Sequence, residues 1–290
     1  MNSSTKAKEK SKVVASRTFR VLAAMLTLTL LVYSAVCAGF YLWQNSLVFK
    51  PERALHATPA RHGLAFEDLR LEAPDGTRLA AWYVPGRPDG RQVLLLHGNG
   101  GNISRYLRTL LVLHELGHSV LALDYRGYGA STGTPSEAGA YQDAAAAFDF
   151  LVEHHARDGA DVIIYGRSLG GAVASWLAAH RPCAGLILES TFTRLTDVGS
   201  YRYPWLPVRL LSRNQFDSVT HMAKVDCPIL VAHGGQDTTV PQAFGRALAH
   251  AAGPRAVFLD LPGGHSDAFI QGGATYYRHL DQFMRRGVID

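Results

Sequence analysis

One five-residue pattern, Gly-Arg-Ser-Leu-Gly at residues 166–170, constrains this chain more than any other feature. It fits G-x-S-x-G, in which a strand turns sharply into a helix and leaves the serine hydroxyl exposed at the turn. The flanks agree with this pattern. The apolar, β-branched run 162–165 predicts a buried parallel strand, and the small residues 171–180 predict a helix that packs closely on it. A plain glycine-rich loop is the alternative, and these flanks disfavour it. We therefore predict that Ser168 is a nucleophile.

A serine hydroxyl needs a histidine as its base, and a carboxylate to orient that histidine. In enzymes that use this turn, the acid and then the histidine follow the serine along the chain. Residues 228–232 predict a buried strand that leads into a glycine turn carrying Asp237. Residues 256–261 predict another strand, followed by His265 in a glycine-rich loop. Both side chains are expected beyond the carboxyl ends of strands, where parallel-sheet enzymes place their chemistry. We predict Asp237 as the acid and His265 as the base.

Two other carboxylates compete for the role of the acid. Asp260 lies inside its predicted strand, where a structural hydrogen bond is the expected role. Glu189 ends the predicted strand 186–188 and could reach the same histidine from a neighbouring strand. We favour Asp237, because a Gly-x-Asp turn presents its carboxylate freely.

The oxyanion formed during acyl transfer needs two preorganised N–H donors. Residues 93–96 predict a buried strand that leads into the loop His97-Gly98-Asn99-Gly100-Gly101-Asn102. Its glycines allow the backbone to turn N–H groups toward the serine. A plain glycine turn is the alternative when the loop is considered by itself. Beside the predicted serine turn, we assign the two donors to the backbone N–H groups of Asn99 and Leu169.

Five segments in fixed order carry a resemblance to a known family. They are residues 97–102 (HGNGGN), 124–131 (DYRGYGAS), 166–171 (GRSLGG), 233–237 (HGGQD) and 264–267 (GHSD). Through them the chain resembles membrane-anchored proteins with an α/β-hydrolase domain. That branch lies beside the serine aminopeptidases and monoacylglycerol-lipase-like enzymes and includes animal protein depalmitoylases. The resemblance covers about residues 40–285 and implies Ser168, Asp237 and His265 as catalytic residues. Those depalmitoylases carry an N-terminal cysteine cluster, which this chain lacks, so their substrate is not transferred.

Predicted strands alternate with helical stretches from Glu67 to the C-terminus, which favours an α/β architecture. We predict one domain over residues 44–290, with the α/β-hydrolase fold and a mostly parallel, doubly wound sheet. One helix is expected to start with Thr134 as its cap, Pro135 at its first helical position and Glu137 bonding back to the N–H of the cap. Residues 191–224 are too long for an ordinary loop and rich in aromatic side chains. We predict a small cap there; a helical excursion packed on the core is the alternative.

The positive charge of the chain is concentrated at its N-terminus. Residues 1–20 contain six Lys or Arg and one Glu, a net charge of +5, which equals the net charge of the whole chain, 29 minus 24. Residues 21–290 together therefore carry no formal net charge. The basic residues form a tail, and nucleic acid is not an expected partner.

An uncharged stretch, residues 21–43, follows the tail and ends in aromatic residues. At about 1.5 Å per residue it can span the roughly 30 Å hydrocarbon core of a bilayer. We predict a single transmembrane anchor, with residues 1–20 cytoplasmic and the domain extracytoplasmic (periplasmic or luminal), because positive residues stay inside. A cleaved signal peptide is the alternative, since Val36-Cys37-Ala38 resembles a cleavage site. The apolar run continues past it, which favours an uncleaved anchor.

The three cysteines, Cys37, Cys183 and Cys227, show no metal-binding or redox spacing. We expect neither a metal nor an organic cofactor. Cys183 and Cys227 each precede a predicted strand, and a disulfide could join them in an oxidising compartment. Two buried thiols are the favoured interpretation.

These features predict a membrane-anchored serine hydrolase that cleaves carboxylic esters or thioesters through an acyl-enzyme. Its substrate would be a small molecule, a lipid or another acyl compound. A serine peptidase or amidase is an alternative, because it uses the same triad. A catalytically silent scaffold that acts as a binding module is another, and the complete set of triad residues argues against it.

Overall fold

The computed structural model describes residues 3–289. They fall into two compact units. One comprises the residues up to Gln44 together with Leu210–Arg213, and the other comprises Asn45–Arg209 together with the residues from Asn214 onward.

The first unit is dominated by helix α1, Ser3–Val48, whose last turn belongs to the second unit. Its stretch Val14–Val48 has a mean hydropathy of 2.2 and is long and apolar enough to cross a membrane. Within residues 3–289 it is the one helix that meets these criteria. Large apolar side chains along it are exposed, which soluble proteins avoid over so long a surface. The predicted apolar segment is thus a continuous helix, and its passage through a membrane stays a prediction.

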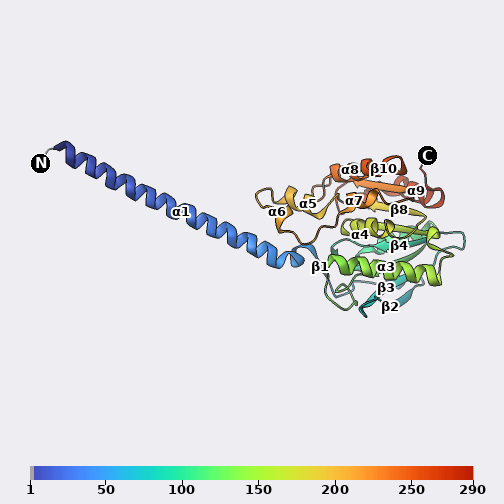
Figure 1. Cartoon of the computed structure of the whole chain (residues 1–290). Coiled ribbons are helices and arrows are strands. Elements are labelled where there is room, and N and C mark those ends of the chain that lie inside the picture. Colours follow the sequence, from blue (N-terminus) through green and yellow to red (C-terminus); the bar gives the residue numbers. More distant parts are fainter. Residues whose placement is uncertain (1–2, 290) are drawn as a thin grey trace. The chain divides into compact units, whose positions relative to one another are not determined.

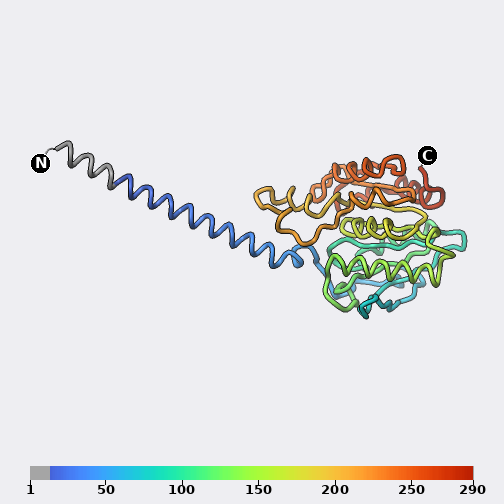
Figure 2. The backbone as a smooth tube through the Cα atoms, viewed as in Figure 1, coloured from blue at the N-terminus to red at the C-terminus, as the bar shows by residue number. Residues whose placement is uncertain are grey.

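The second unit is built on an eight-stranded sheet of order β10-β9-β8-β7-β4-β6-β3-β2. Only the pairs β2–β3 and β3–β6 are antiparallel, so the sheet is mostly parallel, as predicted. Figure 2 shows the chain passing from cyan strands at one edge to orange and red elements at the other. The strands are β2 Glu67–Glu72, β3 Arg78–Val84, β4 Gln92–Leu96, β6 Ser119–Asp124, β7 Val162–Arg167, β8 Gly185–Glu189, β9 Ile229–Gly234 and β10 Ala256–Leu261.

Helices cover both faces of the sheet because successive strand residues point to opposite sides. Leu94 and Leu96 enter one hydrophobic core, whereas Val93 and Leu95 enter the other. Helices α3, α4 and α8 pack on the first face (Figure 1), and α2 and α9 pack on the second. The helices are α2 Leu107–Glu115, α3 Glu137–His154, α4 Leu169–Ala178, α8 Gln242–Ala252 and α9 Ala268–Arg286.

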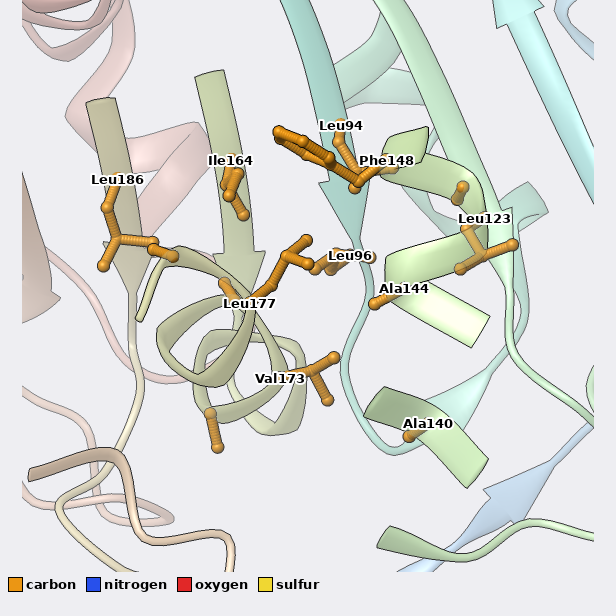
Figure 3. Close-up of a cluster of buried hydrophobic side chains, with 14 of the residues drawn as sticks. Leu94, Leu96, Leu123, Ala140, Ala144, Phe148, Ile164, Val173, Leu177 and Leu186 are labelled. Atoms are coloured by element: carbon orange, nitrogen blue, oxygen red, sulfur yellow. The ribbon is translucent and has the colours of Figure 1, made fainter. Parts of the chain in front are cut away.

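The core of the first face lies between the central strands and two helices (Figure 3). Leu94 of β4, Ile164 of β7, Val173 and Leu177 of α4 and Phe148 of α3 all belong to this buried cluster. These side chains are buried. They fix α4, and with it the start of that helix, against the carboxyl end of β7.

Residues 191–224 contain three short helices, α5 Leu195–Arg202, α6 Val208–Leu211 and α7 Ser218–Met222. Helix α7 packs against α4 and α8, as an excursion on the core would. The short stretch Leu210–Arg213 is grouped with the first unit, where its backbone bonds to the buried side chain of Gln44. The role of this region as a cap stays a prediction.

The start of helix α3 differs from the expected one. Ser136, not Thr134, is its cap: the Ser136 side chain accepts a hydrogen bond from the Gly139 N–H. Glu137 is the first helical residue, and its carboxylate accepts the backbone N–H groups of Gln215 and Phe216. The expected return bond within the helix is replaced by a tertiary contact that the local sequence does not reveal.

Candidate active site

Ser168 occupies the turn between β7 and α4, and its backbone is strained. Its φ of 53° and ψ of −120° lie where side chains other than glycine are rare. The surrounding glycines make the turn possible. A Cβ at Gly166 would lie 2.2 Å from the Gly170 carbonyl oxygen, and a Cβ at Gly170 would lie 2.1 Å from that of Leu96. The Gly166 and Gly170 positions of the pattern therefore allow the helix to approach the strands.

Ser168, His265 and Asp237 follow β7, β10 and β9, at the same carboxyl edge of the sheet. His265 Nε2 lies 3.1 Å from Ser168 Oγ. His265 Nδ1 lies 2.7 Å from Asp237 Oδ2. Ser168 and His265 are half-buried, and Asp237 is buried. The structure thus brings together the three residues predicted from separate motifs, in the order of contacts that a triad requires.

Asp237 is held as an ionised carboxylate. Its Oδ1 accepts the N–H groups of Thr239 at 2.9 Å and Val240 at 2.8 Å, and its Oδ2 also faces His233 Nε2 at 3.3 Å. Burial raises the pKa of Asp237, but the hydrogen bonds from His233, His265 and Val240 outweigh this effect and hold the pKa well below its usual range. A negative charge is therefore present to orient His265 and to stabilise its protonated form. The contact of His233 was not anticipated from the sequence.

The two rival carboxylates are engaged elsewhere. The Glu189 carboxylate contacts Arg167 Nε at 3.1 Å and accepts the hydroxyl of Tyr165. Asp260 is exposed and binds Arg246 at 2.6 Å and Gln242 at 2.7 Å. Within the described part of the chain, neither carboxylate bonds to His265.

The loop after β4 passes beside Ser168. A Cβ at Gly98 would lie 3.3 Å from the Ser168 Cβ, and the Gly98 N–H is taken up by the Tyr106 hydroxyl at 2.8 Å. Asn99 is the residue that follows Gly98 in this loop. Leu169 is the first residue of α4, where N–H groups lack helical acceptors and the helix dipole favours negative charge. Their assignment as oxyanion donors stays a prediction that this arrangement suits.

A short strand ties this loop to the residues that follow helix α1. Strand β1, Lys50–Pro51, pairs in parallel with β5, Gly100–Gly101. The Asn99 carbonyl accepts the Lys50 N–H at 2.9 Å, and the Asn99 side chain donates to the Val48 carbonyl at 2.9 Å. Both contacts lie within the second unit. The predicted oxyanion loop is thus fixed by backbone that directly continues the apolar helix.

A hollow of about 620 Å³ opens at Ser168 and His265. Its walls are mainly backbone, polar groups and basic side chains rather than long apolar ones. Besides the two catalytic candidates, it is lined by Lys50, Glu52, residues 98–101, Arg105, Tyr106, Arg167 and Ser266. No residue of the predicted cap, 191–224, is among the lining residues that the structure describes.

Within the described residues, no group of three or more His, Cys, Asp or Glu could hold a metal ion.

Residues 87–214 match the protein family described as serine aminopeptidase, S33. The chain is 34% identical over 271 residues to the alpha/beta hydrolase domain-containing protein WAV2 of Arabidopsis thaliana, covering 84% of this chain and 88% of that protein. It is 33% identical over 264 residues to an uncharacterized membrane protein of Saccharomyces cerevisiae, covering 85% and 90% of the two chains.

Among solved structures, the esterase Pf2001 of Pyrococcus furiosus superposes with a TM-score of 0.70 at 19% identity, covering 82% of this chain and 98% of that one. At that identity the likeness shows the fold alone. The mostly parallel sheet with helices on both faces is the α/β-hydrolase fold, as predicted.

Proposed function

The chain belongs to the α/β-hydrolase family, and on that premise we propose that it is a membrane-anchored serine hydrolase acting on carboxylic esters or thioesters. The observation that carries the proposal is the continuous line of contacts from Asp237 through His265 to the Ser168 hydroxyl. The strained backbone of Ser168 supports it, because such strain is kept where it serves a site.

In the proposed reaction, Ser168 Oγ attacks the acyl carbonyl while its proton passes to His265 Nε2. The N–H groups of Asn99 and Leu169 stabilise the negative charge that develops on the carbonyl oxygen. His265 then gives its proton to the departing alkoxide or thiolate. Water, activated by the same histidine, releases the acid from the acyl-enzyme. The ionised Asp237 stabilises the imidazolium in both steps.

The character of the hollow bears on the substrate. Its polar and basic lining offers little apolar wall for a long acyl chain, whereas Lys50 and Arg105 can attract polar or anionic groups. We therefore expect esters with short acyl groups to react faster than long-chain ones. A peptidase or amidase would use the same triad, so leaving groups must be compared directly.

The membrane part of the proposal is supported by helix α1 and by the relative from Saccharomyces cerevisiae that is named a membrane protein. The basic tail before the apolar stretch favours a cytoplasmic N-terminus and an extracytoplasmic domain.

The function is tested by labelling the full-length protein, in detergent, with a fluorophosphonate that reacts with activated serines. Wild type should be labelled and should hydrolyse members of a panel of esters and thioesters. The Ser168→Ala variant should lose labelling and about 10⁴-fold or more of the activity, with an unchanged circular dichroism spectrum. Heat-denatured wild type controls for non-specific labelling. Labelling that persists in Ser168→Ala would assign the nucleophile elsewhere. A folded wild type that neither labels nor turns over any substrate would favour the silent scaffold.

A further inference from the structure

An ion pair beside the triad, between Arg167 and Glu189, has no role in the reaction described above. Arg167 ends β7 and Glu189 ends β8, and the two residues are register partners in the sheet. Arg167 Nε lies 3.1 Å from Glu189 Oε1. Glu189 is buried, and Arg167 exposes 18% of its side chain. Burying charges is costly unless they are paired and hydrogen-bonded.

On the inner side of the pair, the hydrogen bonds of Glu189 go to its other carboxylate oxygen. Glu189 Oε2 accepts a hydrogen bond from the hydroxyl of Tyr165, on the neighbouring strand β7. It accepts a second one, at 3.2 Å, from the hydroxyl of Tyr276. Burial, followed by the charge of Glu189, raises the pKa of both tyrosines well above the usual value, so both remain donors. Tyr276 belongs to α9, the helix that begins three residues after His265. Glu189 thereby connects the strand of the nucleophile to the element that follows the histidine.

The outer side of the pair reaches both loops of the site. Arg167 Nη2 donates to the backbone carbonyl of His265 at 2.8 Å. The guanidinium also lies 5.8 Å from the centre of the Tyr106 ring, a cation–π contact. The Tyr106 hydroxyl in turn accepts the N–H of Gly98, the residue before Asn99. One guanidinium therefore contacts the histidine loop directly and the oxyanion loop through one ring.

We propose that Arg167 is a positioning residue, locked by Glu189, that sets the place of His265 relative to Ser168 and steadies the loop of Asn99. The inference rests on the proposed hydrolase function. His265 follows two glycines whose backbone groups bond to Gln236 and Asp267, and Arg167 adds a third tether at the carbonyl of His265 itself.

The geometry also explains why this position carries arginine. A planar guanidinium presents donors in several directions at once, so it can face Glu189, donate to the His265 carbonyl and lie over Tyr106. A lysine ammonium keeps the charge but cannot serve these partners together. Charge alone is therefore insufficient at this position.

The test compares Arg167→Lys, Arg167→Gln and Glu189→Gln, in full-length protein, with the exposed pair Arg181–Asp149 as the control site. Active enzyme is first counted by fluorophosphonate titration, so that rates refer to folded, labelled protein. We expect kcat to fall about 100-fold in Arg167→Gln and about tenfold in Arg167→Lys, with KM changed much less, because misplacing a catalytic group costs rate rather than binding. Arg181→Gln should match wild type. The double variant that combines Arg167→Gln with Glu189→Gln should show a smaller fold-loss of kcat than the product of the losses in the two single variants.

A pH profile separates positioning from a merely structural role. In Glu189→Gln the charge of Arg167 stays beside His265 without its partner, so protonation of the imidazole becomes less favourable. The acid limb of kcat/KM, which follows protonation of the base, should move to lower pH. The other charged groups around His265 are unchanged in this variant; they are Asp237, Asp267, Lys50, Glu52 and Arg105. A variant that only unfolds more readily would keep the wild-type limb.

Two results would overturn the proposal. One is Arg167→Gln with wild-type kcat per titrated site, and the other is Arg167→Lys with full activity, since that would show that charge suffices. If Arg167→Gln folds poorly, the isosteric Glu189→Gln still decides, because an unmoved acid limb and unchanged kcat would reject the role. Failure of the proposed function is distinguishable, because wild type would then not react with the fluorophosphonate at all.

Discussion

His265 Nδ1 lies 2.7 Å from Asp237 Oδ2, although the two residues come from loops after different strands and are 28 positions apart in the sequence. The contact depends on β9 and β10 lying side by side in parallel, which places both loops at one edge of the sheet. Asp237 is further fixed by two backbone N–H groups, so the carboxylate is held for the histidine rather than for solvent.

This contact predicts that Asp237→Asn loses about 10³–10⁴-fold in kcat, because the amide cannot stabilise the imidazolium and favours the wrong tautomer of His265. Steady-state kinetics on a matched, folded preparation checks the loss. Asp260→Asn is the control, since Asp260 forms an exposed ion pair with Arg246 and does not bond to His265. Glu189→Gln should lose less than Asp237→Asn. The reverse ranking would make Glu189 the acid.

The strained backbone of Ser168 predicts a gain in stability when the strain is removed. Glycine adopts a φ of 53° without steric cost, whereas alanine does not. We expect Ser168→Gly to be inactive but about 1 kcal/mol more stable than Ser168→Ala, since strain relief of about 1–3 kcal/mol exceeds the added chain entropy of glycine. Denaturant unfolding of the two variants in the same detergent measures the difference. Equal stability would show that the surrounding glycines already relieve the turn.

The fold could be predicted from the sequence, and so could the position of Ser168, Asp237 and His265 at one edge of the sheet. Each of these residues follows a run of apolar, β-branched residues that marks a strand. Their catalytic role stays a prediction. The contacts of Arg167 with Glu189 and His265 could not be foreseen, since they depend on the register of β7 against β8 and on side-chain direction. The cap of α3 lies two residues after the predicted one, at Ser136, and Glu137 accepts the distant N–H of Gln215, which the local sequence does not reveal.

The bond between Lys50 and Asn99 predicts that the segment after α1 supports the oxyanion loop. Lys50→Pro removes the N–H that donates to the Asn99 carbonyl, whereas Lys50→Ala removes only the side chain and keeps that bond. We expect Lys50→Pro to be about tenfold slower than Lys50→Ala in kcat, because a loosened donor stabilises the transition state less well. Comparison of the two variants isolates the backbone bond from the side chain. Equal rates would mean that the remaining contacts of Asn99 hold the loop.

The two domain cysteines offer a chemical report on the compartment. Cys183 and Cys227 are free in the structure, and their sulfur atoms lie 2.9 Å apart. If the domain is extracytoplasmic, we expect them to be joined, because oxidising compartments convert adjacent thiols to disulfides by exchange. Cells are treated with an alkylating reagent before lysis, and the peptides containing both residues are weighed without reduction. Full alkylation of both thiols under denaturing conditions would show that the two cysteines are not joined, which is the interpretation that the sequence favours.

The apolar stretch of α1 predicts an uncleaved anchor with the domain outside the cytoplasm. Six Lys or Arg precede residues 21–43, whereas only Lys50, Arg53 and Arg61 follow closely, and this asymmetry sets orientation. A stretch of 23 residues also exceeds the apolar region of a typical signal peptide, about 7–15 residues. Protease added to intact cells or spheroplasts should digest the domain, and the protein should stay with membranes through a carbonate wash. Protection until the membrane is broken would reverse the orientation. An intact mass that begins at Gly39 would show cleavage after Ala38, which would remove the anchor while leaving the domain exported.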